Sequence, residues 1–131
     1  MRSAVKKGLR YETRVARAIR DWNASLEVPG RFLPGPWIQF QDASPGLHWA
    51  QPDIVVDFPN ITLLLEAKLT QSDAAYLQLT GLYAPLLTHI FKKPVACVQV
   101  CRNLRYRQNM IRTPDEALIN PNLVHVWHFT I

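Results

Sequence analysis

The stretch Pro52–Thr70, PDIVVDFPNITLLLEAKLT, decides the fold of this chain. It holds two apolar runs joined by Phe-Pro-Asn at residues 58–60, which is the turn signal expected between two antiparallel strands. The second run, residues 61–69, is almost continuously aliphatic, a pattern typical of a strand that is buried on both faces. The stretch therefore predicts a hairpin near the centre of a sheet.

Four charged residues interrupt these apolar runs. Glu66 and Lys68 alternate with Ala67, so both side chains must project from one face of the strand while Ala67 projects from the other. In an antiparallel hairpin the start of the first strand lies opposite the end of the second, so Asp53 should face Glu66 and Lys68. Asp57 shares that face but lies about 13 Å further along, too far to share one ion.

Buried charges are expensive unless they are paired with each other or bound to a metal. We therefore interpret Asp53, Glu66 and Lys68 as a functional cluster, with a structural Glu-Lys pair at a sheet edge as the alternative. An aspartate and a glutamate are hard oxygen ligands that suit Mg²⁺ or Mn²⁺, and a neighbouring lysine can orient or deprotonate a water.

The pairs Pro52-Asp53 and Glu66-Ala67-Lys68 resemble the motif of the PD-(D/E)xK nuclease superfamily. The resemblance implies a single α/β domain over residues 1–131, with a restriction-endonuclease-like αβββαβ core and a mixed central sheet flanked by helices. It also implies that Asp53, Glu66 and the backbone carbonyl of Ala67 hold Mg²⁺, or Mn²⁺ in its place, and that Lys68 positions the attacking water.

Residues 3–26 predict an amphipathic helix, because apolar residues recur at spacings of three and four. The predicted apolar stripe comprises Val5, Leu9, Ala16, Ile19, Trp22 and Leu26, and the basic residues Lys6, Arg10, Arg14 and Arg17 lie roughly opposite. Glu12 falls inside the apolar stripe. The segment GLRYETRVARAI resembles the first helix of archaeal-type Holliday junction resolvases, which implies that Glu12 holds a second metal or its water shell. The alternative is a surface glutamate paired with Arg10 or Arg14.

A second helix is predicted over residues 74–90, with Pro85 kinking or breaking it. In several branches of the superfamily a glutamine on this helix points back at the site, which would give Gln78 a catalytic role; a plain polar position is the alternative. Some nucleases of the recombination-exonuclease type pair that glutamine with a tyrosine four residues later. Here the tyrosines are Tyr76 and Tyr83, so the chain departs from that pattern.

The other expected elements follow from local composition. Residues 28–36 are rich in proline and glycine and predict a loop, residues 37–41 predict a short edge strand, and residues 42–51 predict a loop beside the hairpin. The position of that loop makes His48 a candidate for contact with substrate, and local packing is the alternative. Residues 94–101 predict a core strand and residues 123–131 a terminal strand.

Cys97 and Cys101 fall in the predicted core strand. Four strand positions separate them by about 13 Å, beyond disulfide reach, which favours core thiols over a bridge or a zinc pair.

The formal net charge of +5 favours an anionic partner, of which nucleic acid is the commonest. The segment RNLRYR brings Arg102, Arg105 and Arg107 around Tyr106, the mixture that phosphate contacts and base stacking use. We therefore predict that these residues bind nucleic acid together with His48 and the helix residues Arg10 and Arg14. A merely solvated basic loop is the alternative.

No apolar run approaches the roughly 18 residues of a membrane span, and the first residues lack the core of a signal peptide. We expect a cytoplasmic protein, or a virus-encoded one acting in the host cytoplasm.

The resemblance implies a metal-dependent DNA endonuclease that cleaves four-way junctions in recombination and repair, acting as a homodimer. Another PD-(D/E)xK nuclease, of the restriction or replication-repair type, and a non-catalytic DNA-binding module are the alternatives.

Overall fold

The hairpin predicted from residues 52–70 forms the middle of the sheet. In the computed structural model, which describes residues 3–130, β4 (Ile54–Asp57) pairs antiparallel with β5 (Thr62–Thr70). The register places Ile54 opposite Leu65 and Asp57 opposite Thr62. Side chains 62–67 of β5 are all buried, so the prediction of a strand covered on both faces is confirmed.

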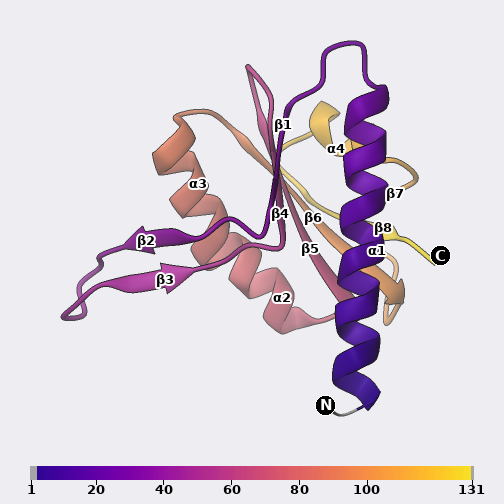
Figure 1. Cartoon of the computed structure of the whole chain (residues 1–131), viewed down its shortest axis with the longest axis horizontal. Helices are drawn as coiled ribbons and strands as arrows, with labels where there is room; N and C mark the ends of the chain where they lie inside the picture. The colour runs from indigo at the N-terminus through magenta and orange to yellow at the C-terminus, as the bar shows by residue number, and fades with distance from the viewer. Residues whose placement is uncertain (1–2, 131) are drawn as a thin grey trace.

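Six strands form one mixed sheet, in the order β1-β4-β5-β6-β8-β7 (Figure 1). β1 (Arg31–Pro34) is antiparallel to β4 and forms one edge. β6 (Val95–Asn103) runs parallel to β5, β8 (Val124–His128) runs parallel to β6, and β7 (Met110–Ile111) completes the other edge in parallel with β8. The predicted α/β fold with a mixed sheet flanked by helices is therefore confirmed.

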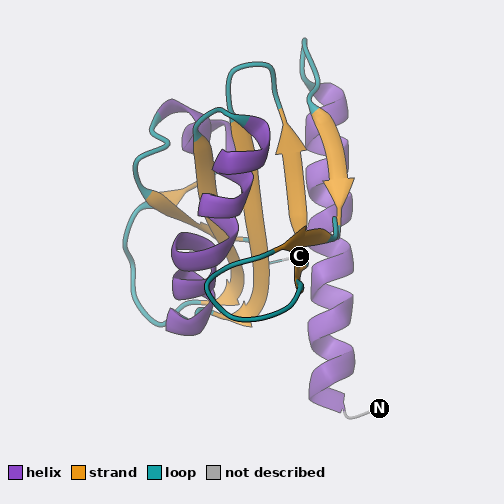
Figure 2. Ribbon diagram, turned by 90° about the vertical axis from the view of Figure 1, so that its left-hand side faces the viewer, coloured by secondary structure: helices purple, strands orange, loops and turns teal. Residues whose placement is uncertain are grey.

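Helices cover both faces of this sheet (Figures 1 and 2). α1 (Ser3–Ser25) and α4 (Pro114–Ile119) pack on one face. α2 (Asp73–Gln78), a single π-helical turn (Leu79–Tyr83) and α3 (Ala84–Phe91) form the other layer.

Side chains of β5 alternate between the two layers. Leu63, Leu65 and Ala67 enter the core beneath α1, whereas Leu64 enters the core beneath α3. Because Glu66 and Lys68 share the parity of Leu64, they project toward the layer of α2 and α3.

The predicted first helix is confirmed, but its predicted apolar stripe is wrong at the N-terminal end. The buried positions are Tyr11, Val15 and Ile19, whereas Val5 and Leu9 are about half exposed. Figure 2 shows the reason: the N-terminal turns of α1 extend past the end of the sheet, so no strand lies beneath them.

The segment before β4 differs from its prediction. Residues 28–36, expected as a loop, contain the edge strand β1. A Cβ at Gly30 would lie 2.9 Å from the carbonyl oxygen of Asp57, so glycine permits the close approach that starts β1. Pro34 is tolerated because it ends an edge strand, where its missing N–H breaks no inner ladder.

Residues 37–51 also differ from their prediction, because they form a separate two-stranded ribbon. The expected edge strand at 37–41 is β2 (Ile38–Phe40), and the expected loop at 42–51 contains its partner β3 (His48–Ala50). The ribbon projects to one side of the sheet (Figure 1). At its base the N–H of Gly35, whose φ is +57°, donates to the carbonyl of Asp53 at 2.7 Å.

The predicted terminal strand is confirmed as β8, which lies inside the sheet between β6 and β7. Cys97 and Cys101 are buried free thiols, which confirms that prediction, and burial raises the pKa of each to about 11. Within the described residues, no helix is both long and apolar enough to cross a membrane.

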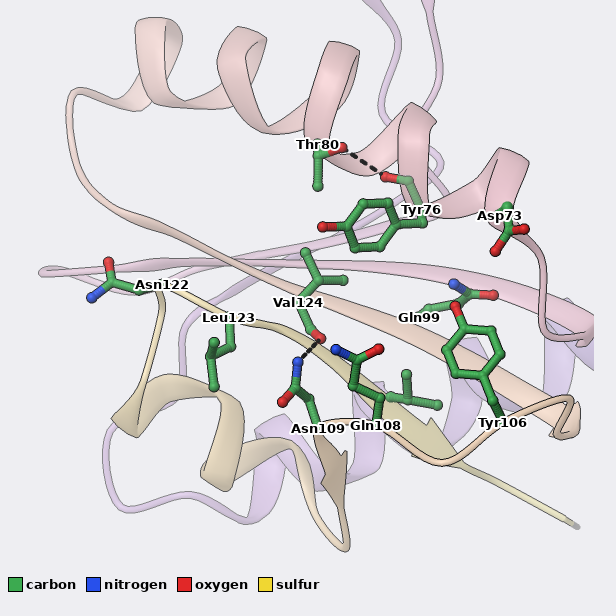
Figure 3. A pocket seen from close by; sticks show the side chains of 11 residues that line it. Asp73, Tyr76, Thr80, Gln99, Tyr106, Gln108, Asn109, Asn122, Leu123 and Val124 are labelled. Carbon is green, nitrogen blue, oxygen red and sulfur yellow. Dashed lines mark hydrogen bonds between the residues drawn. The ribbon is translucent and has the colours of Figure 1, made fainter.

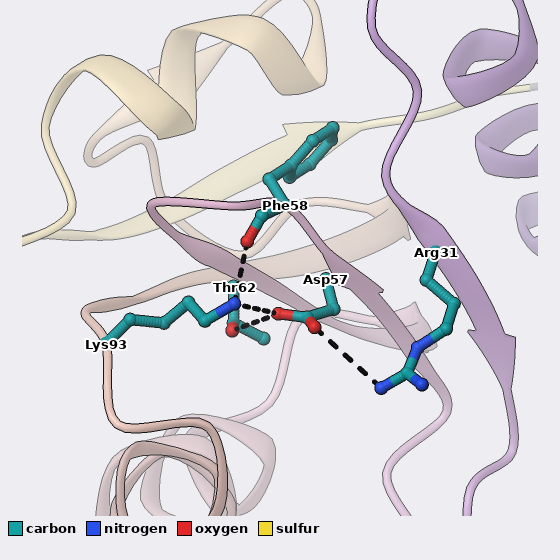
Figure 4. A network of polar contacts seen from close by, with 5 residues as sticks. All are labelled: Arg31, Asp57, Phe58, Thr62 and Lys93. Atoms are coloured by element: carbon teal, nitrogen blue, oxygen red, sulfur yellow. Dashed lines mark hydrogen bonds and ion pairs between the residues drawn. The ribbon is translucent and has the colours of Figure 1, made fainter.

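Asp57 belongs to a polar network at the end of the hairpin that carries the turn (Figure 4). Its Oδ1 accepts from Lys93 Nζ at 2.9 Å and from Thr62 Oγ1 at 3.1 Å, and Arg31 approaches its Oδ2 at 3.8 Å. Lys93 also donates to the carbonyl of Phe58 at 2.9 Å. Asp57 is thus a structural carboxylate with partners of its own, as its distance from Asp53 along the strand predicted.

Candidate active site

Two reciprocal hydrogen bonds lock Asp53 and Glu66 together across the hairpin. The backbone N–H of Asp53 donates to Glu66 Oε1 at 2.7 Å, and the backbone N–H of Ala67 donates to Asp53 Oδ2 at 2.8 Å. Asp53 immediately precedes β4, and Glu66 lies opposite it in β5. The predicted meeting of these residues is confirmed, and one oxygen of each carboxyl group is left without a backbone donor.

Burial makes this pair hard to ionise fully. Glu66 is 2% exposed, and desolvation together with the charge of Asp53 raises its pKa to about 8. Desolvation also raises the pKa of Asp53, opposed by the Ala67 N–H and the charge of Lys68. Two adjacent buried carboxyl groups repel each other when both are ionised, and a bound cation would offset that repulsion.

Lys68 is half-buried beside the pair, on the same face of β5 as Glu66. Among the described residues its ammonium takes part in no ion pair. Its positive charge nevertheless opposes the rise in pKa that burial causes at Glu12, Asp53 and Glu66. The amine therefore lies within electrostatic range of the cluster without being bound by it.

Glu12 reaches the cluster from α1. It lines a cavity of about 230 Å³ together with Asp53, at the base of the ribbon. Desolvation raises the pKa of Glu12 first, the charge of Asp53 raises it further, and Lys68 opposes both. In the described part of the chain Glu12 forms no ion pair with Arg10 or Arg14, so the surface-pair alternative is not what the structure shows.

The donor set fits a magnesium ion that keeps most of its waters. Within residues 3–130, no group of three or more His, Cys, Asp or Glu side chains is arranged to hold a metal ion. Mg²⁺, however, is commonly bound by one or two carboxylates with water completing its shell, and Asp53 and Glu66 supply two. The Ala67 side chain is buried in the core beneath α1, and the part played by its carbonyl stays a prediction.

Gln78 does not occupy the inward position of its helix. It is exposed at the last residue of α2, whereas Leu79 and Tyr83 in the π-helical turn face the core. Tyr83 is the residue that the sequence did not indicate: its hydroxyl donates to the Gln51 carbonyl at 3.4 Å. Burial, followed by the charges of Glu66 and Asp53, raises its pKa to about 12, which places it beside the cluster.

The predicted basic segment begins in the last residues of β6 and continues beyond it, at the same end of the sheet as Lys68. Arg102, Arg105, Tyr106 and Arg107 are all exposed there. The buried side chain of Gln71 anchors this segment, because its Oε1 accepts from the backbone N–H of Arg105 at 2.8 Å and of Tyr106 at 3.0 Å.

The other predicted nucleic-acid contacts lie on separate elements. Arg10 and Arg14 are exposed on α1. His48 lies in the ribbon, with Nε2 3.2 Å from Asp42 Oδ1 and its ring against Phe40, so its contacts are local.

No protein-family model matches this chain, and neither does any curated protein or solved structure. A functional proposal for it therefore rests on the fold and on the cluster of Glu12, Asp53, Glu66 and Lys68.

Proposed function

We propose that this chain is a metal-dependent DNA endonuclease of the PD-(D/E)xK type. The observation that carries the proposal is the pair of carboxyl groups of Asp53 and Glu66, locked by backbone hydrogen bonds. Lys68 lies on the same face of β5 and forms no ion pair within residues 3–130. A protein that only bound DNA would have no need for two buried acids and a free amine at one point.

The residues divide the work of phosphodiester hydrolysis among them. Asp53, Glu66 and the carbonyl of Ala67 would hold Mg²⁺, which polarises a phosphate and lowers the pKa of bound water. Lys68 orients the attacking water and offsets negative charge that builds up on the phosphate. Glu12, which approaches from α1, holds a second metal or its water shell.

The order of elements supports this class. When the ribbon is set aside, the chain runs α1, β1, β4, β5, then α2 with α3, then β6, which is the αβββαβ order expected for such nucleases. In this order the ribbon is an insertion between the first and second core strands.

DNA is the substrate that the charge favours. The net charge is +5, and exposed arginines flank the cluster on α1 and after β6. We propose a four-way junction as the preferred form, cut by a homodimer in recombination and repair. A restriction or replication-repair nuclease on the same scaffold is the second candidate, and a non-catalytic module the third.

The test is cleavage of labelled four-way junction, flap, single-stranded and linear duplex DNA in Mg²⁺, Mn²⁺ or EDTA. Wild type is compared with Asp53→Asn and Lys68→Ala, and Asp21→Asn makes the same acid-to-amide change at an exposed carboxylate. Paired nicks in the junction alone, absent in EDTA and in both site variants, are the expected result.

Other outcomes separate the candidates. Metal-dependent cutting of linear duplex at the same rate would discard junction selectivity and keep the nuclease. Binding without cutting of any substrate would leave the DNA-binding module. Light scattering that shows a monomer at the working concentration would count against a resolvase.

A further inference from the structure

We propose that a second cavity, beside the carboxylate cluster, binds an unpaired nucleobase of the DNA. The cavity has a volume of about 500 Å³ and lies between α2, the segment after β6 and the strands β6 and β8 (Figure 3). Its lining is mainly amide and phenol side chains with few apolar ones. The residues used below are Gln99, Asn109, Tyr76, Tyr106 and Asp73.

The cavity adjoins the proposed catalytic face. Gln99 of β6 is the register partner of Glu66 in β5, and neighbouring strands lie about 4.8 Å apart. Both side chains project toward the layer of α2. A base held in this cavity would therefore belong to a nucleotide close to the bond that is cut.

Gln99 supplies a fixed hydrogen-bond donor. Its side chain is 1% exposed, and its Oε1 accepts from the backbone N–H of Ser72 at 2.7 Å, which sets the orientation of the amide. Its Nε2 has no acceptor among the described residues, and Gln99 lines the cavity with this amide (Figure 3). An amide N–H₂ that opens onto a cavity can donate to a carbonyl oxygen of a bound ligand.

Asn109 supplies the complementary acceptor. Its Nδ2 donates to the carbonyl of Val124 at 3.3 Å, so its Oδ1 is left free to accept. A donor and an acceptor in one cavity match the edge of a nucleobase, which presents carbonyl oxygens beside ring or exocyclic N–H groups.

Two half-exposed tyrosines supply stacking surfaces. Tyr76 comes from α2 and Tyr106 from the segment after β6, and Figure 3 shows their rings on different sides of the cavity. Gln71 holds the backbone of Tyr106 in place through the bond described above. Aromatic rings of this kind stack on any base, because every base has a π face.

Charge distinguishes a base from a phosphate here. The lining contains one carboxylate, Asp73, and no Lys or Arg, so the cavity interior does not favour an anion. Arg105 and Arg107 lie outside, on either side of Tyr106, where the sugar-phosphate backbone of the same strand would run. Cavities of about 300–1,000 Å³ hold small ligands, so the volume suffices for a nucleoside.

This proposal rests on the proposed function in one respect, which is that DNA is the molecule that supplies the base. Base binding can be measured without cleavage. In EDTA, fluorescence anisotropy compares a labelled oligothymidylate with an abasic oligonucleotide of the same length and charge. We expect wild type to prefer the oligothymidylate by about tenfold, the scale of one stacked base. Tyr76→Ala and Tyr106→Ala should remove the preference, whereas Trp37→Ala, an aromatic truncation on the ribbon, should keep it.

Equal affinity of wild type for the two oligonucleotides would overturn the base site. A preference that survives in both tyrosine variants would overturn it as well. Circular dichroism melting establishes that each variant is folded before binding is compared. Cleavage with Mg²⁺ is scored separately: cutting without base preference rejects the cavity alone, and base preference without cutting rejects the nuclease alone.

Discussion

Replacing Glu66 by glutamine should stabilise the metal-free protein above about pH 8 and change its stability little below about pH 5. The pKa of Glu66 rises from 4.5 to about 8 because burial and the neighbouring Asp53 disfavour its charged form. The folded protein therefore keeps the Glu66 proton up to about pH 8, whereas the unfolded chain releases it near pH 4.5. Stability falls as the pH rises through this window.

The size of the effect follows from the same shift. The rise in the pKa of Glu66 from 4.5 to about 8 corresponds to roughly 5 kcal/mol of unfolding free energy. This free energy is lost at about 1.4 kcal/mol per pH unit as the pH rises. Glutamine stays neutral at every pH, and its side-chain oxygen can still accept the N–H of Asp53. The variant should therefore lack the slope while keeping the hydrogen bond.

The measurement is urea denaturation in EDTA at about pH 5 and about pH 8.5, for wild type and Glu66→Gln, with Glu27→Gln as a matched change at an exposed glutamate. The reasoning would be refuted if the free energies of unfolding of wild type and Glu66→Gln differed by the same amount at the two pH values. Added Mg²⁺ at the higher pH should stabilise wild type, by about 2.7 kcal/mol at a hundredfold excess over Kd, and leave Glu66→Gln nearly unchanged. Equal stabilisation of both proteins would place the ion elsewhere.

Two further predictions concern the scaffold. Lys93→Ala leaves the largely buried Asp57 without its ammonium partner and should destabilise the fold by about 3 kcal/mol. Arg31→Ala removes a longer, exposed contact to the same carboxylate and should change stability by less than about 1 kcal/mol. Both free energies of unfolding are measured by urea titration. Cys97 and Cys101 should resist iodoacetamide in the native protein at about pH 8, because both are buried and their pKa values are raised to about 11. Both thiols should react once urea unfolds the chain. Mass spectrometry that finds alkylation of the native protein would contradict this prediction.

The central hairpin and its charged cluster were predictable because local rules determine them. An alternating strand, a Phe-Pro-Asn turn and an aliphatic strand fix both the pairing and the face of each side chain. The meeting of Asp53 with Glu66 follows from that register alone, and the structure adds the two backbone bonds that hold it.

The elements that sequence reasoning missed depend on tertiary contacts. β1 contains a proline and follows a glycine, a composition that indicates a loop unless the close approach of Gly30 to Asp57 is known. The exposure of Val5 and Leu9 depends on where the sheet ends beneath α1. Tyr83 faces the cluster because a π-helical turn shifts the helical spacing. Pro85 indicated that this helix would be disturbed, but not that the disturbance would be a π-helical turn.

The hydrogen bond from the Gly35 N–H to the Asp53 carbonyl joins the two ends of the segment that contains the ribbon. The chain leaves the sheet after β1 and returns at the same point, immediately before a proposed metal ligand. The length of residues 36–52 can therefore change without altering the spacing of the carboxyl groups, because the two ends of this segment are joined by the hydrogen bond. The ribbon tip is consequently the position at which a tag, a fluorophore or a second domain can be grafted onto this protein while the site geometry is preserved.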